Sequence, residues 1–152
     1  MFYYYGIDGF PDHGWGCVYR NIQSVISFIK DEIPTIPNML EFFNKDISVE
    51  SKRELWITPK DAKDFLEFYL ENYLLKYDYY ELNSDEFNIL VEKVKLSEIP
   101  TIIDDGVFSY ILFYNDNKLY LADPHIIKNN VRCINPDWLY NKDRLMCLTI
   151  FR

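Results

Sequence analysis

Apolar residues near the start of the chain recur at the spacing of a helix that buries one face. After Cys17 this pattern comprises Val18, Ile22, Val25, Ile26 and Ile29. It predicts an amphipathic helix that ends between residues 31 and 34. A weaker helical pattern follows Pro37, and residues 44–54 are polar and irregular.

A further helix begins at Thr58, where the sequence reads Thr-Pro-Lys-Asp. Threonine caps a helix, proline suits its first position, and an acid three residues after the cap completes a capping box. The residues expected on its inner face are Ala62, Phe65, Leu66, Tyr69 and Tyr73. We expect Ser84 to cap another helix, whose inner face comprises Phe87, Leu90, Val91 and Val94.

Most of the second half of the chain consists of β-branched and aromatic runs bounded by turns. Strands are expected at 77–82, 101–104, 107–114, 118–123 and 145–151. The turn at 115–117 would join two of them into an antiparallel meander, and residues 135–138 form a turn or a brief helix. Helices early and strands late predict an α+β domain.

The composition predicts one globular domain over residues 1–152, since 49 % of residues are apolar and no linker or repeat interrupts the chain. With 16 basic and 24 acidic residues the net charge is -8, which argues against nucleic acid as a partner. The sequence has no charged leader and no apolar run of about 18 residues. We therefore expect a cytoplasmic monomer without a membrane span.

The three cysteines include no CxxC pair, which disfavours a zinc site and a disulfide framework. Cys17 is the candidate for chemistry, because it stands where a glycine-rich loop gives way to the predicted helix. The helix dipole and the unpaired N–H groups at that end stabilise a thiolate. The alternative is a buried structural thiol, the role that we assign to Cys133 and Cys147.

Only two histidines, His13 and His125, could take the proton of such a thiol. His13 lies in the same loop as Cys17 and is expected at the surface. His125 closes an apolar run that predicts a buried strand, in which residues two apart share a face. Asp123 and His125 should then project together, and Pro124 suggests a strand end or edge. A cysteine, a histidine and an orienting carboxylate are the components of a cysteine protease.

Residues 14–20 read Gly-Trp-Gly-Cys-Val-Tyr-Arg, and further short matches to one family follow in order. They comprise Tyr5, Trp56-Ile57, Asp123-Pro124-His125, Asn141-Lys142-Asp143 and Cys147-Leu148. Together these segments resemble the ubiquitin-fold-modifier-specific cysteine proteases. The resemblance implies a papain-like fold, with the nucleophile at the N-terminus of the central helix and an antiparallel sheet from the C-terminal half.

The same resemblance implies a mechanism that needs no metal or other cofactor. Cys17 would be the nucleophile, His125 the base and Asp123 the acid, while the Tyr5 hydroxyl and the Cys17 N–H would stabilise the oxyanion. The residues expected to bound a narrow passage for a glycine-ended tail are Gly14, Trp15 and Gly16. The implied reaction is cleavage after the C-terminal glycine of a ubiquitin-like modifier, in maturation of its precursor or in release from its conjugates.

Other functions remain open. The autophagy cysteine proteases also combine Gly-Trp-Gly-Cys with Asp-Pro-His, but Tyr19-Arg20 is not their usual continuation. A related deubiquitinase shares Cys-x-Tyr-Arg-Asn, but its histidine comes from an earlier strand, where this chain has Tyr110. A binding module that captures a modifier without cleaving it is the alternative of another class.

Two features depart from the family pattern. Trp56-Ile57 continues into Thr58-Pro59, where the family has glycine and a small residue, and the region between Cys17 and Asp123 is shorter than in the animal enzymes. These departures indicate trimmed substrate-binding loops. We assign Trp56 and Trp138 to the core, and we expect Arg20 to bond to carbonyls or to pair with an acid beside the first helix.

Overall fold

The computed structural model of the chain describes residues 1–81 and 84–152. Within them six strands form one antiparallel sheet, in the order β1-β6-β2-β3-β4-β5. Their bounds are β1 Leu74–Glu81, β2 Thr101–Asp104, β3 Ser109–Asn115, β4 Lys118–Ala122, β5 Val131–Cys133 and β6 Arg144–Phe151. The predicted meander is β2-β3-β4, and its last turn places Asp116 and Asn117 at positive φ, as a tight hairpin requires.

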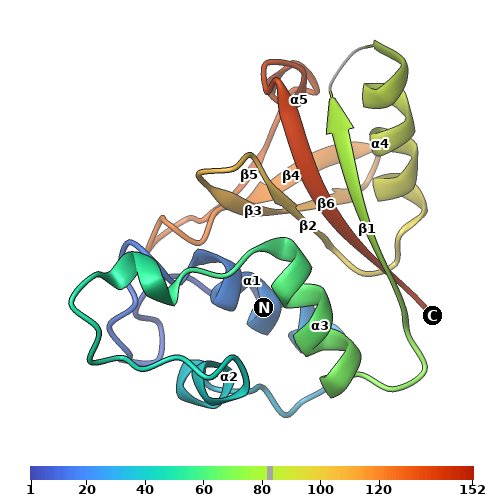
Figure 1. Ribbon diagram of the computed structural model, residues 1–152. Helices are drawn as coiled ribbons and strands as arrows, with labels where there is room; N and C mark the ends of the chain where they lie inside the picture. Colours follow the sequence, from blue (N-terminus) through green and yellow to red (C-terminus); the bar gives the residue numbers. More distant parts are fainter. Residues whose placement is uncertain (82–83) are drawn as a thin grey trace.

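The described helices comprise α1 Cys17–Ser27, α2 Ile36–Phe42, α3 Pro59–Tyr69, α4 Ser84–Leu96 and α5 Asp137–Tyr140, with a 3-10 turn at Lys52–Leu55. Figure 1 shows α1, α2 and α3 gathered in the lower half of the view and α4 with the sheet in the upper half. Among residues 1–81 and 84–152, no helix is long and apolar enough to cross a membrane.

The central strands are buried on both faces, because each face of the sheet has its own apolar core. Ile102 and Leu148 pack with α1, α2 and α3. Their chain neighbours Ile103 and Cys147 pack with α4 and α5 on the opposite face. Since successive side chains of a strand point to opposite faces, a continuous apolar run is what such a strand requires.

Several predicted boundaries were wrong. Helix α1 ends at Ser27 rather than at 31–34, because Phe28 and Ile29 turn back and donate to Val25 and Ile26 in a tight last turn. Strand β1 begins three residues earlier than predicted, and β5 was not predicted at all. The predicted strand end at Leu82 and the side chain of Ser84, which was expected to cap a helix, lie outside what the structure describes; α4 itself begins at Ser84.

The start of α3 was predicted correctly. The Thr58 side chain accepts from the Asp61 N–H at 3.1 Å, and the Asp61 carboxylate accepts from the Thr58 N–H at 2.9 Å. Ala62 and Phe65 are buried, as expected, whereas Tyr73 lies beyond the end of the helix. This capping box fixes the segment that leads from Trp56 into the helix.

Candidate active site

Cys17 is the first residue of α1, and it is half-buried and free. Gly16 precedes it as the N-cap and offers no side-chain acceptor to the first turn. The N–H of a first helical residue has no acceptor within its own helix. The thiol therefore stands beside unpaired donors at the positive end of the helix dipole, where a thiolate is stabilised.

His125 and Asp123 lie side by side, although not for the predicted reason. Strand β4 ends at Ala122, and both residues belong to the turn that follows, so the prediction that His125 closes a buried strand was wrong. Asp123 Oδ1 accepts from the His125 backbone N–H at 3.0 Å and lies 2.6 Å from His125 Nδ1. A carboxylate that bonds to the backbone two residues on defines a turn of its own, and this turn brings the two side chains together.

The charge of His125 is set by its neighbours. Burial lowers the pKa of the imidazole, but the hydrogen bonds to Asp123 and Cys17 outweigh it and raise the pKa to about 9. Burial raises the pKa of Asp123, and the hydrogen bonds from His125 bring it below its ordinary value. At neutral pH the pair is therefore an imidazolium beside a carboxylate, and the ring lines the same cavity as Cys17.

Tyr5 joins the N-terminal segment to this group. Its backbone N–H donates to the Pro124 carbonyl at 3.0 Å, and its buried ring meets the His125 ring edge to face at 5.3 Å. Burial, and then the charge of Cys17 and a hydrogen bond to it, raise the pKa of the Tyr5 hydroxyl far above its ordinary value. The hydroxyl therefore keeps its proton and remains a donor. His13 is exposed, and its ring packs against Tyr5 at 5.6 Å.

Two further aromatic rings pack on His125. Phe108 meets the imidazole edge to face at 5.1 Å, and Tyr110, on β3, does so at 5.6 Å. Sequence reasoning missed Phe108, which stands two residues after Gly106 and belongs to no motif. These rings exclude water from one side of His125, and they help to account for its burial.

A cavity of about 300 Å³ opens beside Cys17 and His125. The residues that line it include Tyr5, Gly14, Trp15, Trp56, Ile57, Thr58, Val107 and Phe108. Its walls are mostly apolar, and Cys17 and His125 both belong to its lining. An extended peptide tail could lie there with a backbone carbonyl at the thiol.

Trp56 is 42 % exposed and lies on the rim of this cavity, so its assignment to the core was wrong. Its neighbours Leu55 and Ile57 are buried, and the chain here is extended, so Trp56 points the other way. The Arg53 guanidinium lies 5.4 Å from the centre of the indole ring. Alternation of side chains could have revealed this arrangement from the sequence. Trp138, by contrast, is half-buried against the second core.

The two glycines before Cys17 are required for different reasons. Gly14 has a φ of +85°, which favours glycine, and it lines the cavity together with Trp15. A Cβ on Gly16 would lie 2.0 Å from Asp12 Oδ2. Among the described residues that line the cavity Gly16 does not appear, so the side chain of Asp12, and not a bound tail, accounts for this glycine.

Asp104, at the end of β2, is a buried carboxylate in the cavity wall that sequence reasoning missed. Burial raises its pKa to about 6, although its Oδ1 accepts from the Gly106 N–H at 2.7 Å. The pKa of the adjacent Asp105 is shifted in the opposite direction. Burial raises its pKa, but the Phe108 N–H and Lys142 lower it below its ordinary value. The cavity therefore holds an acidic group close to its titration point, with no role in the predicted triad.

A cysteine at the start of a helix beside an antiparallel sheet, with a His–Asp pair after one of its strands, is the arrangement of the papain-like fold. The crystal structure of UfSP from C. elegans matches 97 % of this chain and 32 % of its own, with a TM-score of 0.68 and 18 % sequence identity. This match confirms the predicted α+β, papain-like fold.

Sequence comparisons narrow the class. The profile of peptidase family C78 matches residues 1–52. A probable Ufm1-specific protease of Oryza sativa subsp. japonica is 29 % identical over 148 residues, which cover 82 % of this chain and 22 % of the rice protein. Ufm1-specific protease 1 of Mus musculus is 38 % identical over 39 residues, which cover 26 % of this chain and 18 % of the mouse protein.

This chain is similar to Ufm1-specific proteases, as its motifs predicted. The matched part of the chain spans about a fifth of the length of these curated relatives. The family profile covers the loop and helix that carry Cys17, and the similarity in fold extends over 97 % of the chain.

Proposed function

We propose that this protein is a thiol protease that cleaves after the C-terminal glycine of a ubiquitin-like modifier, with the ubiquitin-fold modifier Ufm1 as the preferred substrate. The observation that carries the proposal is the His125 ring, which lies 2.6 Å from Asp123 and lines the same apolar cavity as Cys17. The names of the relatives support the choice of modifier. Residues 1–152 would act as a single catalytic unit in the reducing cytoplasm.

In the proposed reaction Cys17, as thiolate, attacks the carbonyl carbon of the terminal glycine. The negative oxygen of the tetrahedral intermediate accepts hydrogen bonds from the Cys17 N–H and the Tyr5 hydroxyl. His125 donates its proton to the leaving amine as the C–N bond breaks. Water then attacks the thioester carbonyl, His125 takes a proton from that water, and the thiolate leaves. Asp123 holds the imidazole and stabilises its cation throughout.

The cavity suits a small-residue tail. Gly14 and Trp15 form part of the wall next to Cys17, and the exposed Trp56 forms part of the rim. Glycine at the cleaved position needs no side-chain pocket there. Bulkier residues at that position would meet the aromatic wall, which gives selection by exclusion.

A deubiquitinase or an autophagy-modifier protease with the same triad is the alternative within this class. The deubiquitinase takes its histidine from the earlier strand, where this chain has Tyr110 on β3. The Tyr110 ring packs against His125. A binding module without activity is the alternative of another class. The placement of Cys17 and His125 in the lining of one cavity supports catalysis over capture.

Purified protein should be incubated separately with Ufm1, ubiquitin and an autophagy modifier, each carrying a short C-terminal extension after its terminal glycine. We expect release of the extension from Ufm1, measured by intact mass, and loss of that release in Cys17→Ala. Cys133→Ala, which removes an exposed thiol, is the matched control and should retain the activity. Cleavage of none of the three substrates by the wild-type protein would refute the proposed function, and cleavage of ubiquitin alone would move it to the deubiquitinases.

A further inference from the structure

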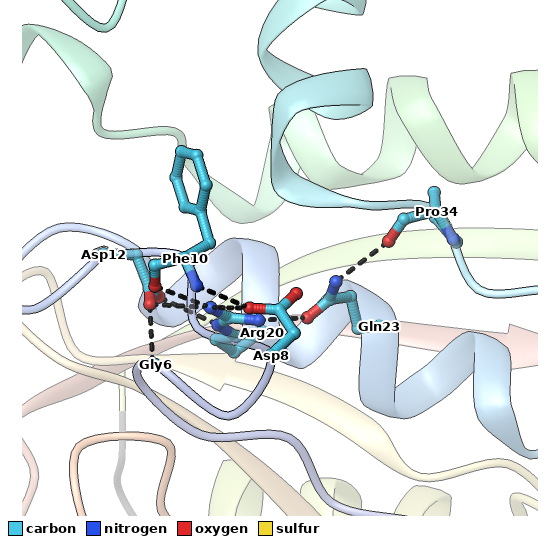
Figure 2. Close-up of polar contacts among 7 residues, drawn as sticks. All are labelled: Gly6, Asp8, Phe10, Asp12, Arg20, Gln23 and Pro34. Atoms are coloured by element: carbon cyan, nitrogen blue, oxygen red, sulfur yellow. Dashed lines mark hydrogen bonds and ion pairs between the residues drawn. The ribbon is translucent and has the colours of Figure 1, made fainter.

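A buried arginine beside the candidate site takes no part in the proposed chemistry. Arg20 lies on α1, one turn after Cys17, and has no exposed surface. Its Nε donates to Asp12 Oδ2 at 2.9 Å and its Nη2 to Asp12 Oδ1 at 2.8 Å (Figure 2). Nη2 also reaches the partly exposed Asp8 at 3.0 Å, and Nη1 donates to Gln23 at 3.0 Å. Nη2 also donates to the Phe10 carbonyl at 3.3 Å, so Arg20 pairs with acids and bonds to a carbonyl beside the first helix, as the sequence predicted.

Asp12 also accepts backbone hydrogen bonds from the residue after Tyr5 and from the residue before Cys17. Tyr5 and Cys17 are the two expected oxyanion donors. The N–H of Gly6, the residue after Tyr5, donates to Asp12 Oδ1 at 2.8 Å (Figure 2). The N–H of Gly16, the residue before Cys17, donates to the Asp12 carbonyl at 2.9 Å. One residue thus fixes the backbone next to each of the two donors.

We propose that Asp12 and Arg20 are positioning residues, which set the Tyr5 hydroxyl against the Cys17 N–H so that both meet the oxyanion. This inference rests on the proposed function, because it assumes attack by Cys17 on a carbonyl. Donors of this kind accelerate a reaction only if they are in place before the charge develops. The ion pair has two parallel bonds, which fix direction as well as distance, and only a guanidinium offers that fork.

Simple stabilisation of the loop would not need two buried charges. Neither Asp12 nor Arg20 has exposed surface, and removing both charges from water carries a large desolvation penalty. Apolar residues of similar volume often hold a core equally well. What the charged pair adds is orientation, and the residues that it orients are the neighbours of Tyr5 and Cys17.

The test compares Arg20→Lys and Asp12→Asn with Glu67→Gln, which removes an exposed ion pair on α3. All variants carry Cys133→Ala, so that Cys17 is the accessible thiol. The first readout is the affinity for acetyl-Ala-glycinal, whose aldehyde adds the Cys17 sulfur and places an oxygen at the oxyanion position. The second is the alkylation rate of Cys17 by iodoacetamide, which forms no oxyanion.

We expect aldehyde affinity to fall at least about tenfold in Arg20→Lys and Asp12→Asn, and alkylation to stay within about twofold of the parent. Glu67→Gln should change neither. In a Tyr5→Phe background the effect of Arg20→Lys should shrink, because one of the two donors is already gone. Unchanged aldehyde affinity in a folded variant, or parallel losses in both readouts, would overturn the inference.

If the single variants do not fold, the double variant Asp12→Asn/Arg20→Gln replaces them, because it leaves no unpaired buried charge. Failure of this variant to fold as well would make the pair structural only and would also overturn the inference. Neither readout contains a modifier. A wild-type protein that cleaves no modifier, yet shows the expected aldehyde pattern, would therefore refute the proposed function and leave the positioning role standing.

Discussion

Two neighbours of the His125 imidazole, Asp123 and Cys17, favour its cation. Against the opposing effect of burial they raise its pKa to about 9. A folded-state pKa above the unfolded value of about 6.5 stabilises the native protein below pH 6.5, and this contribution is lost as the pH rises through 9. The same proton is the one that the leaving amine needs, so stability and activity should decline over the same alkaline range.

Asp123→Asn tests this coupling. We expect the alkaline limb of kcat/KM to move from about pH 9 toward the ordinary histidine range, because an amide does not stabilise the imidazolium. We also expect kcat to fall by roughly 10²-fold. A pH series of initial rates with a modifier precursor measures both. Asp116→Asn, in the exposed β3–β4 turn, is the control, and an unmoved limb in Asp123→Asn would contradict the assignment.

At the scale of elements, α3 and its capping box hold one wall of the cavity, since Thr58 and Pro59 are both lining residues. Thr35 caps α2 through a single bond, in which it accepts from the Asn38 N–H at 3.2 Å. The two helices therefore differ in how their first turns are satisfied. Of these two helices, α3 is the one at which a second side chain, that of Asp61, returns a bond to the cap.

We expect Thr58→Ala to lower the free energy of unfolding by about 1 kcal/mol, measured by urea denaturation. Thr35→Ala should lower it by no more than this, because no reciprocal bond is lost there. A smaller loss in Thr58→Ala than in Thr35→Ala would contradict the view that the capping box anchors this wall.

The sequence predicted the elements that follow local rules. The capping box at Thr58, the hairpin at Asp116 and the inner face of α1 all depend on neighbours along the chain. The pairing of Asp123 with His125 was expected, but on a shared face of a strand. That strand, β4, ends at Ala122, before both residues. The short strand β5 and the exposure of Trp56 escaped prediction, because they depend on what lies across the fold.

The whole molecule brings the site together from three separate segments. Tyr5 comes from the N-terminal segment, Cys17 from the helical layer, and the Asp123–His125 turn from the end of a sheet strand. The N-terminal segment is tied to the turn by the bond from Tyr5 to Pro124. No local pattern could place these three segments side by side, so only the family resemblance pointed to Tyr5 and to its contact with Cys17.

The central claim is that Cys17 attacks the end of a modifier tail that lies in the cavity. The most direct measurement uses Ufm1 with a vinyl sulfone in place of its terminal carboxylate, followed by peptide mapping of the adduct by mass spectrometry. We predict a single adduct, on Cys17, which is lost when the folded probe is replaced by the vinyl sulfone of a glycine alone at the same concentration. An adduct on Cys133, or no adduct on the wild-type protein, would contradict this account.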